Sequence, residues 1–275
     1  MAAVIRDSGS SGGQRRPRPV WRWLVLLVAG VYFLMPLYAA ARFAGVKAYG
    51  SLLSEPGFTD ALWLSVRLAI ITTLITLALM LPTAVYVHLK LPRLRRLLES
   101  LTILPIVIPP VVLITGVLQV APGFLKSTPY LLALEYVILA MPFAYRAIDA
   151  GLRAMDLKTV TEASNSFGAG WTRTLLQVVL PNLTTALLAA TVLTVAMVLG
   201  EYTMSSLDLY TTFPVWLYTN DQTSGTVTVA GSLLALFVTW IVLLLITVIG
   251  TQRGRRFGRQ VSLFTVTRHE DGGTK

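Results

Sequence analysis

Few side chains in this sequence of 275 residues could carry out covalent chemistry. The absence of cysteine excludes disulfides, thiolate nucleophiles and cysteine metal sites, and two histidines, His88 and His269, are too few for a histidine metal centre. No Gly-Lys dipeptide occurs, which excludes a Walker A phosphate loop. We therefore expect no catalytic residue, no metal and no cofactor on this chain.

Three ionisable residues, Arg67, Glu135 and Glu201, lie within long apolar segments. A charge at the centre of a bilayer costs about 2.5–3.5 kcal/mol on insertion scales, so such residues are functional candidates by default. We hypothesise that they share one polar layer of a solute pathway, in which Arg67 pairs with one or both carboxylates. The alternative is that each side chain extends separately to the membrane surface.

Hydroxyl side chains are spaced along one helical face in two segments. The first face holds Ser65, Thr72, Thr76 and Thr83, and the second holds Thr184, Thr191, Thr194, Glu201 and Ser205. One interpretation is a polar lining for a solute, with Thr72, Thr76, Thr194, Tyr202 and Ser205 joining the three ionisable residues. The alternative is close packing between membrane helices, which small hydroxyl residues favour.

The segments that must position these residues are apolar enough to cross a membrane, since 55% of the residues are hydrophobic and only 13% are charged. Roughly 20 mainly apolar residues span the hydrocarbon core. Six candidate spans meet this requirement: Trp21–Ala41, Ala61–Val87, Leu101–Val120, Tyr130–Tyr145, Asn182–Leu207 and Val227–Gly250. The third contains Pro105, Pro109 and Pro110, which predict a kinked or broken helix.

The basic residues predict the orientation of these spans. The net charge is +10, and nineteen of the 23 Lys and Arg residues lie in the two ends of the chain and in the second and fourth connecting loops. Short cytoplasmic loops collect such residues, so both termini are predicted to be cytoplasmic. The charge therefore indicates topology, and we expect no nucleic-acid partner. At about 1.5 Å per residue, Arg67, Glu135 and Glu201 would all lie about 8–9 Å below the outer boundary.

The sequence thus predicts an all-α polytopic protein in a lipid bilayer. Residues 1–20 are expected to form a disordered basic tail, residues 21–250 the membrane domain, and residues 251–275 a second basic cytoplasmic tail. The first span is longer than a signal-peptide core, which favours a retained helix.

The loop between the fourth and fifth spans has internal order of its own. Asp156 is a plausible N-cap, Leu157–Phe167 has helical spacing, and Gly168 is expected to end the helix. A second short helix is predicted over Trp171–Val179, and Leu180-Pro181 then leads into the fifth span. The first helix has an apolar face with Leu157, Val160 and Phe167, which predicts either a partner groove or a position on the membrane surface.

Part of this loop resembles the EAA loop of permease subunits of binding-protein-dependent ABC importers. The residues that carry the resemblance are Glu162-Ala163-Ser164, then Gly168 after three residues, Val178 after nine more, and Leu180-Pro181 after one more. The family pattern is E-A-A, three residues, G, nine residues, I, one residue, L-P, so Ser164 and Val178 are departures. The wider resemblance, over about residues 58–250, is to the type I importer membrane domain with one extra N-terminal helix. Gly200-Glu201-Tyr202 and Phe213-Pro214-Val215-Trp216 look most like the second permease of spermidine/putrescine-type systems, although iron, thiamine, sulfate and molybdate permeases share similar segments.

The resemblance implies that a coupling loop at about residues 155–181 docks into a separate ATPase subunit. The residues expected in this contact are Leu157, Val160, Glu162, Ala163, Ser164, Phe167, Gly168, Leu180 and Pro181. Implied partners are a second permease, identical or different, two ATP-binding subunits holding ATP-Mg, and an extracytoplasmic solute-binding protein. The implied location is the cytoplasmic membrane of a prokaryote, as a multi-pass protein.

Acidic residues near the predicted outer ends, Glu135, Glu201, Asp208 and Asp221, favour a small cation such as a polyamine as the solute. An iron, thiamine or oxyanion permease of the same family is the first alternative. A self-sufficient secondary transporter is the second, but no inverted repeat is visible. A membrane enzyme is the third, and the sequence lacks a cluster of His, Asp and Glu for acid–base or metal chemistry.

Overall fold

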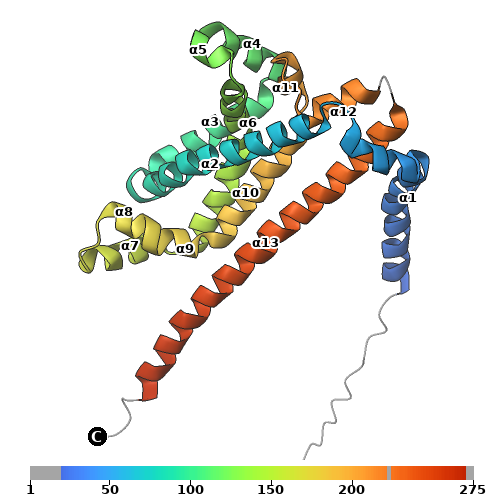
Figure 1. Cartoon of the computed structure of the whole chain (residues 1–275). Helices are drawn as coiled ribbons and strands as arrows, with labels where there is room; N and C mark the ends of the chain where they lie inside the picture. The colour runs from blue at the N-terminus through green and yellow to red at the C-terminus, as the bar shows by residue number, and fades with distance from the viewer. Residues whose placement is uncertain (1–19, 222–223, 271–275) are drawn as a thin grey trace, which may run out of the picture.

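The computed structural model describes residues 20–221 and 224–270, which form helices with short connections and contain no strand (Figure 1). Most of the predicted N-terminal tail, and the last five residues of the predicted C-terminal tail, lie outside the described residues. The all-α class is confirmed.

Four helices are long and apolar enough to cross a bilayer alone: α1 (Val20–Ser51), α2 (Phe58–Lys90), α6 (Pro129–Ala154) and α13 (Gly225–Glu270). Two further spans are bent pairs. Residues Pro92–Val107 meet Pro110–Val120 at 101°, and Trp171–Asn182 meet Thr184–Leu199 at 79°. The described residues therefore hold six candidate spans if each bent pair counts as one.

The bent pairs are built from α3 (Arg95–Val107) with α4 (Pro110–Val120), and from α8 (Trp171–Thr174), the π-helical turn η3 (Leu175–Val179) and α9 (Leu180–Asn182) with α10 (Thr184–Leu199). Short elements complete the described chain: η1 (Leu52–Ser54), η2 (Pro92–Leu94), α5 (Gly123–Lys126), α7 (Leu157–Ser166), α11 (Thr203–Leu207) and α12 (Phe213–Asp221).

The predicted break in the third span is confirmed, because α3 ends before Ile108 and α4 begins at Pro110. The fifth span differs from its prediction: α10 ends at Leu199, and a separate short helix, α11, follows. The Glu201 carboxylate accepts hydrogen bonds from the backbone N–H groups of Met204 and Ser205, at 2.8 and 3.3 Å, so it starts the new helix. At the other end of the chain, α13 continues as a helix past Gly250.

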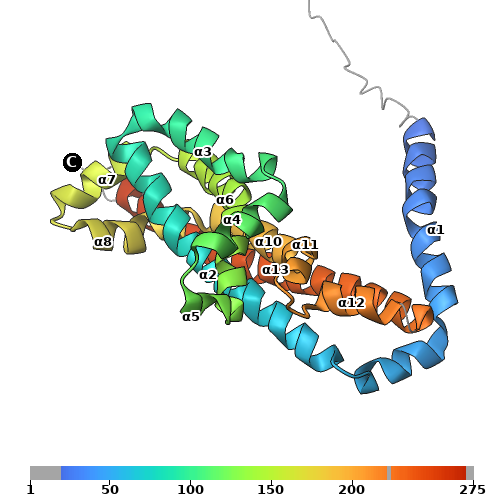
Figure 2. The ribbon, with the colours of Figure 1, turned by 90° about the horizontal axis from the view of Figure 1, so that it is seen from above.

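The core lies where α2, α6 and α10 pack together, and α13 crosses beside α10 (Figures 1 and 2). Small side chains line the contact, including Ala69, Thr72 and Thr76 of α2 and Ala133 and Ala140 of α6, all of them buried. Small residues let membrane helices approach closely, which matters because lipid provides no hydrophobic drive between helices. By contrast, α1 stands away from this bundle and packs mainly against α13 (Figure 2).

An aromatic cluster joins α12 to the start of α2. Phe58 contacts Phe213 and Trp216 at ring-centroid distances of 5.7 and 5.3 Å, and Trp216 Nε1 donates to the Pro56 carbonyl at 2.9 Å. Each aromatic pair contributes about 0.5–1.5 kcal/mol beyond its buried area. The buried Ser65 hydroxyl also accepts from the Phe213 backbone N–H at 2.7 Å. The predicted polar face of α2 is thus used in part to hold α12.

Candidate functional site

The loop between α6 and α10 begins with a capped helix, as predicted. The Asp156 carboxylate accepts from the Thr159 backbone N–H at 3.2 Å and from the Thr159 hydroxyl at 2.7 Å. Hydrogen bonds from the Thr159 hydroxyl and backbone lower the pKa of the Asp156 carboxyl. This cap satisfies free N–H groups at the start of α7 and fixes where the helix leaves α6.

Gly168 ends this helix in the conformation that the sequence predicts. Its φ is +74°, in the left-handed region, and its N–H donates to the Asn165 carbonyl at 2.9 Å. A Cβ at Gly168 would have no atom within 4 Å, so backbone conformation, and not space, favours glycine. The chain then reverses into α8 and η3, which occupy the predicted second helix.

A buried hydrogen bond fastens the two limbs of this coupling loop to one another. Ser164 Oγ of α7 lies 2.9 Å from Thr174 Oγ1 of α8, and both residues are buried. Ser164 is one of the two positions at which the sequence departs from the EAA pattern, and Thr174 provides a hydrogen-bond partner for its hydroxyl. Sequence reasoning did not identify Thr174. The feature that could have indicated it is a second hydroxyl residue ten positions after Ser164.

Between the limbs lies an open groove of about 540 Å³. Its lining residues are Val160, Ala163, Ser164, Phe167, Ala169, Arg173, Gln177, Val178 and Asn182. Phe167 at the tip is 90% exposed, which is unusual for a phenylalanine on an ordered turn. Glu162 and Ala163 are exposed on the same helix, and Lys158 Nζ lies 3.9 Å from the Glu162 carboxylate.

Leu157 does not share this outward position. The expectation that Leu157, Val160 and Phe167 form one exposed apolar face is therefore wrong for Leu157. Only 6% of Leu157 is exposed, because it packs with Leu152 and Val179 in the core where α6 meets the loop. Leu180 and Pro181 are half-buried at the entry to α10. The first turn of α7 therefore attaches the loop to its own chain, and the last turn presents it outward.

The predicted pathway residues separate into buried and accessible groups. Fully buried are Thr72, Thr76, Glu135, Thr194 and Ser205, whereas Arg67 and Tyr202 are exposed and Glu201 is half-buried. Thr72 Oγ1 donates to the Ala133 carbonyl of α6 at 3.2 Å, which is a helix-packing contact. In this conformation, Thr72 agrees with the alternative that the hydroxyl residues pack helices together. A solute-lining role for the five buried residues stays a prediction.

Arg67 bonds to a residue that the hypothesis of a shared layer did not include. Its Nη2 donates to the Tyr130 hydroxyl at 2.7 Å, and its guanidinium carbon lies 5.7 Å from the centroid of that ring. The aromatic ring stabilises the cation without a carboxylate. Glu201 instead caps α11, as described above.

Glu135 is buried in α6, and neither carboxylate oxygen has a hydrogen-bond partner within the part of the chain described. The carboxyl groups of Asp208 and Glu201 are close enough to affect it electrostatically. Burial raises the pKa of Asp208, which lies in the loop after α11. The acidic residues of the predicted outer layer therefore lie near one another, and Arg67 takes no part in a salt bridge that the described residues show.

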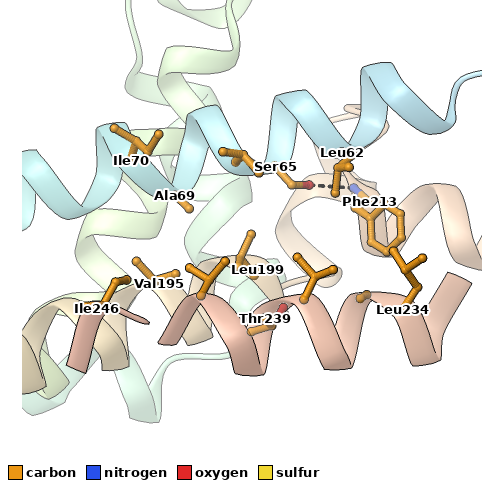
Figure 3. A pocket seen from close by; sticks show the side chains of 14 residues that line it. Leu62, Ser65, Ala69, Ile70, Val195, Leu199, Phe213, Leu234, Thr239 and Ile246 are labelled. Carbon is orange, nitrogen blue, oxygen red and sulfur yellow. Dashed lines mark hydrogen bonds between the residues drawn. The ribbon is translucent and has the colours of Figure 1, made fainter. Parts of the chain in front are cut away.

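A second cavity, of about 280 Å³, lies between α2, α10 and α13 (Figure 3). Aliphatic side chains such as Leu62, Ile70, Val195 and Leu234 project into it, and Ser65 turns its hydroxyl to Phe213 (Figure 3). Its lining offers almost no group that could bind a charged solute. This cavity is therefore not a candidate site for a polar solute.

The helical arrangement and the projecting loop define a class of fold, that of the membrane chains of ABC transporters. A chain of a bacterial alginate ABC transporter, solved in complex with an alginate pentasaccharide-bound periplasmic protein, superposes with a TM-score of 0.63 over 87% of this chain and 96% of that chain. A second structure of a bacterial ABC transporter that imports alginate gives a TM-score of 0.62. Sequence identity is 14% in both cases, so these likenesses establish the fold alone.

Among curated proteins, this chain is similar to the molybdenum transport system permease protein ModB of Mycobacterium tuberculosis and of Mycobacterium bovis. Identity to each is 28% over 252 residues, covering 83% of this chain and 94% of the relative. A probable molybdenum ABC transporter permease protein of Haloferax volcanii is 29% identical over 221 residues, covering 74% of this chain and 81% of the relative. No protein-family model matches the chain. These relatives give no support to the expectation of polyamine-type specificity.

Proposed function

We propose that the chain is a permease subunit of an ABC importer and that its α7–η3 loop docks on a separate ATPase subunit. The observation that carries this proposal is Phe167, 90% exposed at the tip of an ordered loop and beside an open groove. An exposed aromatic ring on a rigid turn is the kind of anchor that a pocket on a partner protein binds. The loop is non-catalytic, and ATP-Mg would be bound and hydrolysed on the partner.

The position of Leu157 disfavours the alternative of an amphipathic helix lying on the membrane surface. Such a helix needs a continuous apolar face for the lipid. Here Leu157 is covered by the core of its own chain, and Phe167 stands beyond the end of α7. What is exposed is one aromatic tip with Glu162 beside it, which suits a protein pocket with a polar rim better than hydrocarbon.

The proposed assembly contains a second permease subunit, two ATP-binding subunits and an extracytoplasmic solute-binding protein in the cytoplasmic membrane of a prokaryote. It is supported by the fold shared with solved ABC transporter chains, one of them with a periplasmic protein bound. Alternating access would follow if ATP binding moves the coupling loops and biases the bundle between inward-open and outward-open arrangements.

For the solute we propose an oxyanion in place of a polyamine. Support comes from the curated relatives, whose names refer to molybdenum transport. The placement of charges agrees with this choice, because Arg67 is exposed whereas Glu135 is buried in the bundle. An approaching anion would therefore meet an accessible cation, whereas the Glu135 carboxyl group is covered.

Replacing Phe167 tests this function. The chain is co-expressed with the permease partner, ATPase and binding protein of its own transport system and reconstituted in proteoliposomes, and ATP-driven uptake of molybdate, sulfate and spermidine is measured. We expect uptake of an oxyanion and not of spermidine. Phe167→Ala should weaken ATPase binding by about 2 kcal/mol, roughly thirtyfold, which is the cost of losing an interface hot spot.

Phe124→Ala is the matched control, since Phe124 is 74% exposed on α5, away from the loop. It should leave ATPase binding and uptake unchanged. Equal loss in both variants would contradict a docking role for Phe167. Solute exchange by the purified chain alone would contradict an ABC permease, and uptake of spermidine alone would overturn the choice of an oxyanion.

A further inference from the structure

A network of charges lies where α6 leads into the coupling loop, and the mechanism proposed so far does not use it. Asp149 lies five residues before the end of α6, and only 6% of it is exposed. Three basic side chains reach it from three helices: the imidazole of His88 of α2 and the guanidinium groups of Arg95 of α3 and Arg153 of α6 itself. Sequence reasoning counted Arg95 and Arg153 as orientation signals and missed their contact with Asp149.

The distances show that one carboxylate serves all three helices. Arg95 donates from Nε to Asp149 Oδ1 at 3.0 Å and from Nη2 to Oδ2 at 3.3 Å, which is a bidentate contact. Arg153 Nη2 lies 2.6 Å from Oδ2, and His88 Nε2 lies 3.1 Å from Oδ1. Glu99 of α3 lies 3.8 Å from Arg153 at the edge of the network. Bidentate guanidinium contacts fix orientation as well as distance.

His88 is held from both sides of its ring. Nδ1 lies 2.9 Å from the Ala84 carbonyl oxygen, so it must carry a hydrogen to donate there. Nε2 faces the Asp149 carboxylate at an ion-pair distance, although its direction does not meet hydrogen-bond geometry. The ring therefore places the end of α2 directly against the Asp149 carboxylate.

The network is asymmetric, because a single buried carboxylate faces two guanidinium groups and a histidine. Removing that negative charge would leave Arg95 and Arg153 close together, with Glu99, 3.8 Å from Arg153, as the remaining carboxylate that the described residues place beside them. Truncating one partner of a buried ion pair leaves an uncompensated charge, which is more costly than the loss of one contact. The ends of α3 and α6 would then repel one another, and His88 of α2 would lose the carboxylate that it faces.

The same region carries the coupling loop. Ile148 and Leu152 of α6 pack with Val85 of α2 and with Leu157, the first residue of α7, in one core cluster. A displacement of α7 is therefore transmitted to the end of α6, and Asp149 links this end to α2 and α3. On the basis of the proposed function, we infer that Asp149 is a positioning residue for coupling: it makes the loop-side ends of α2, α3 and α6 move as one unit with the coupling loop.

Asp149→Asn tests this role in the assembled transporter, reconstituted with its ATPase and binding protein. The ratio of solute imported to ATP hydrolysed should fall by about tenfold, within the usual range for coupling between sites, whereas ATP hydrolysis persists. Asp60→Asn, at an exposed carboxylate at the other end of α2, is the matched control and should keep the wild-type ratio. A protein that is merely less stable would lose both activities in proportion.

Arg153→Gln provides a second variant with less risk to folding, because its side chain is 52% exposed. It should lower the ratio of solute imported to ATP hydrolysed by a smaller factor than Asp149→Asn does. If Asp149→Asn does not fold, the result with Arg153→Gln tests the inference. A wild-type ratio in a folded Asp149→Asn protein, or equal loss of hydrolysis and import, would overturn the inference. A wild-type complex without ATP-driven import would instead contradict the proposed function, so the two failures are distinguishable.

Discussion

Gly151 marks the closest approach between α6 and the start of α10. A Cβ at this position would overlap the Ala186 Cβ and would lie 3.0 Å from Leu183 Cδ2. Glycine is therefore needed at this position because no side chain fits between the two helices. At Gly168, in contrast, the backbone conformation favours glycine. The contact it permits holds the two helices that flank the coupling loop.

Gly151→Ala should accordingly destabilise the protein. The added methyl group overpacks a helix contact, a change that costs about 1–3 kcal/mol, and the loss is measured by unfolding of the purified chain in detergent. Gly116→Ala in α4 is the control, since no atom lies within 4 Å of the added carbon. The control should be neutral or gain up to about 1 kcal/mol from helix propensity. A larger loss in the control than in Gly151→Ala would contradict this account.

Single residues were predictable where local geometry decides their role. Asp156 and Gly168 act on backbone groups a few residues away, so their capping and stop functions follow from the sequence. Arg67 and Glu201 have hydrogen-bond partners other than the ones that the sequence suggested. Tyr130, which binds Arg67, belongs to another helix, and the break before Glu201 depends on packing that one sequence does not reveal.

At the scale of elements, the coupling loop consists of two limbs joined by one buried hydroxyl pair. Within the part of the chain that the structure describes, the side chains of Ser164 and Thr174 hydrogen-bond to one another and to no other side chain. The pair is therefore coupled energetically, and neither residue is optimal without the other. This coupling explains how the loop accepts serine where the EAA pattern has alanine.

Ser164→Ala alone should cost about 1–2 kcal/mol, because it leaves the buried Thr174 hydroxyl unsatisfied. The double variant Ser164→Ala, Thr174→Val should recover most of this loss, since replacing both partners by apolar groups can be nearly neutral. Unfolding measurements on the wild type, the two single variants and the double variant complete the cycle. Additive losses would show that the hydroxyls do not depend on one another.

The elements themselves were largely predictable, because span length and proline chemistry are properties of short segments. The break at Pro109 and Pro110 was expected and is present. The end of α10 at Leu199 was not, since apolar residues continue through Met204 and Leu207 and hydropathy does not register a turn at Gly200.

At the scale of the whole molecule, α2, α6 and α10 form the centre and α1 is held at the periphery (Figure 2). This arrangement depends on contacts between residues far apart in the chain, such as Ser65 with Phe213. Hydropathy shows which segments cross the membrane but not which of them touch. The sequence therefore predicted the candidate spans and the short helices of the loop between α6 and α10, whereas the partners inside the bundle required the structure.

The topology can be tested with single cysteines, because the natural chain has none. A membrane-impermeant maleimide should label Lys126→Cys in intact cells and Lys158→Cys only after permeabilisation. Both side chains are exposed, and the positive-inside rule places the two loops on opposite sides. Labelling of both from the same side would mean that α6 does not cross the bilayer.

The bend of 101° between α3 and α4 has a consequence for what surrounds the protein. Pro109 and Pro110 have no N–H, so the carbonyl oxygens of Pro105 and Ile106 lack the amides four residues ahead that a continuous helix would supply. Hydrocarbon offers no donor to such oxygens. At the bend itself these two oxygens therefore need a donor from water or from polypeptide, although the neighbouring Ile106 and Val107 side chains are apolar and exposed.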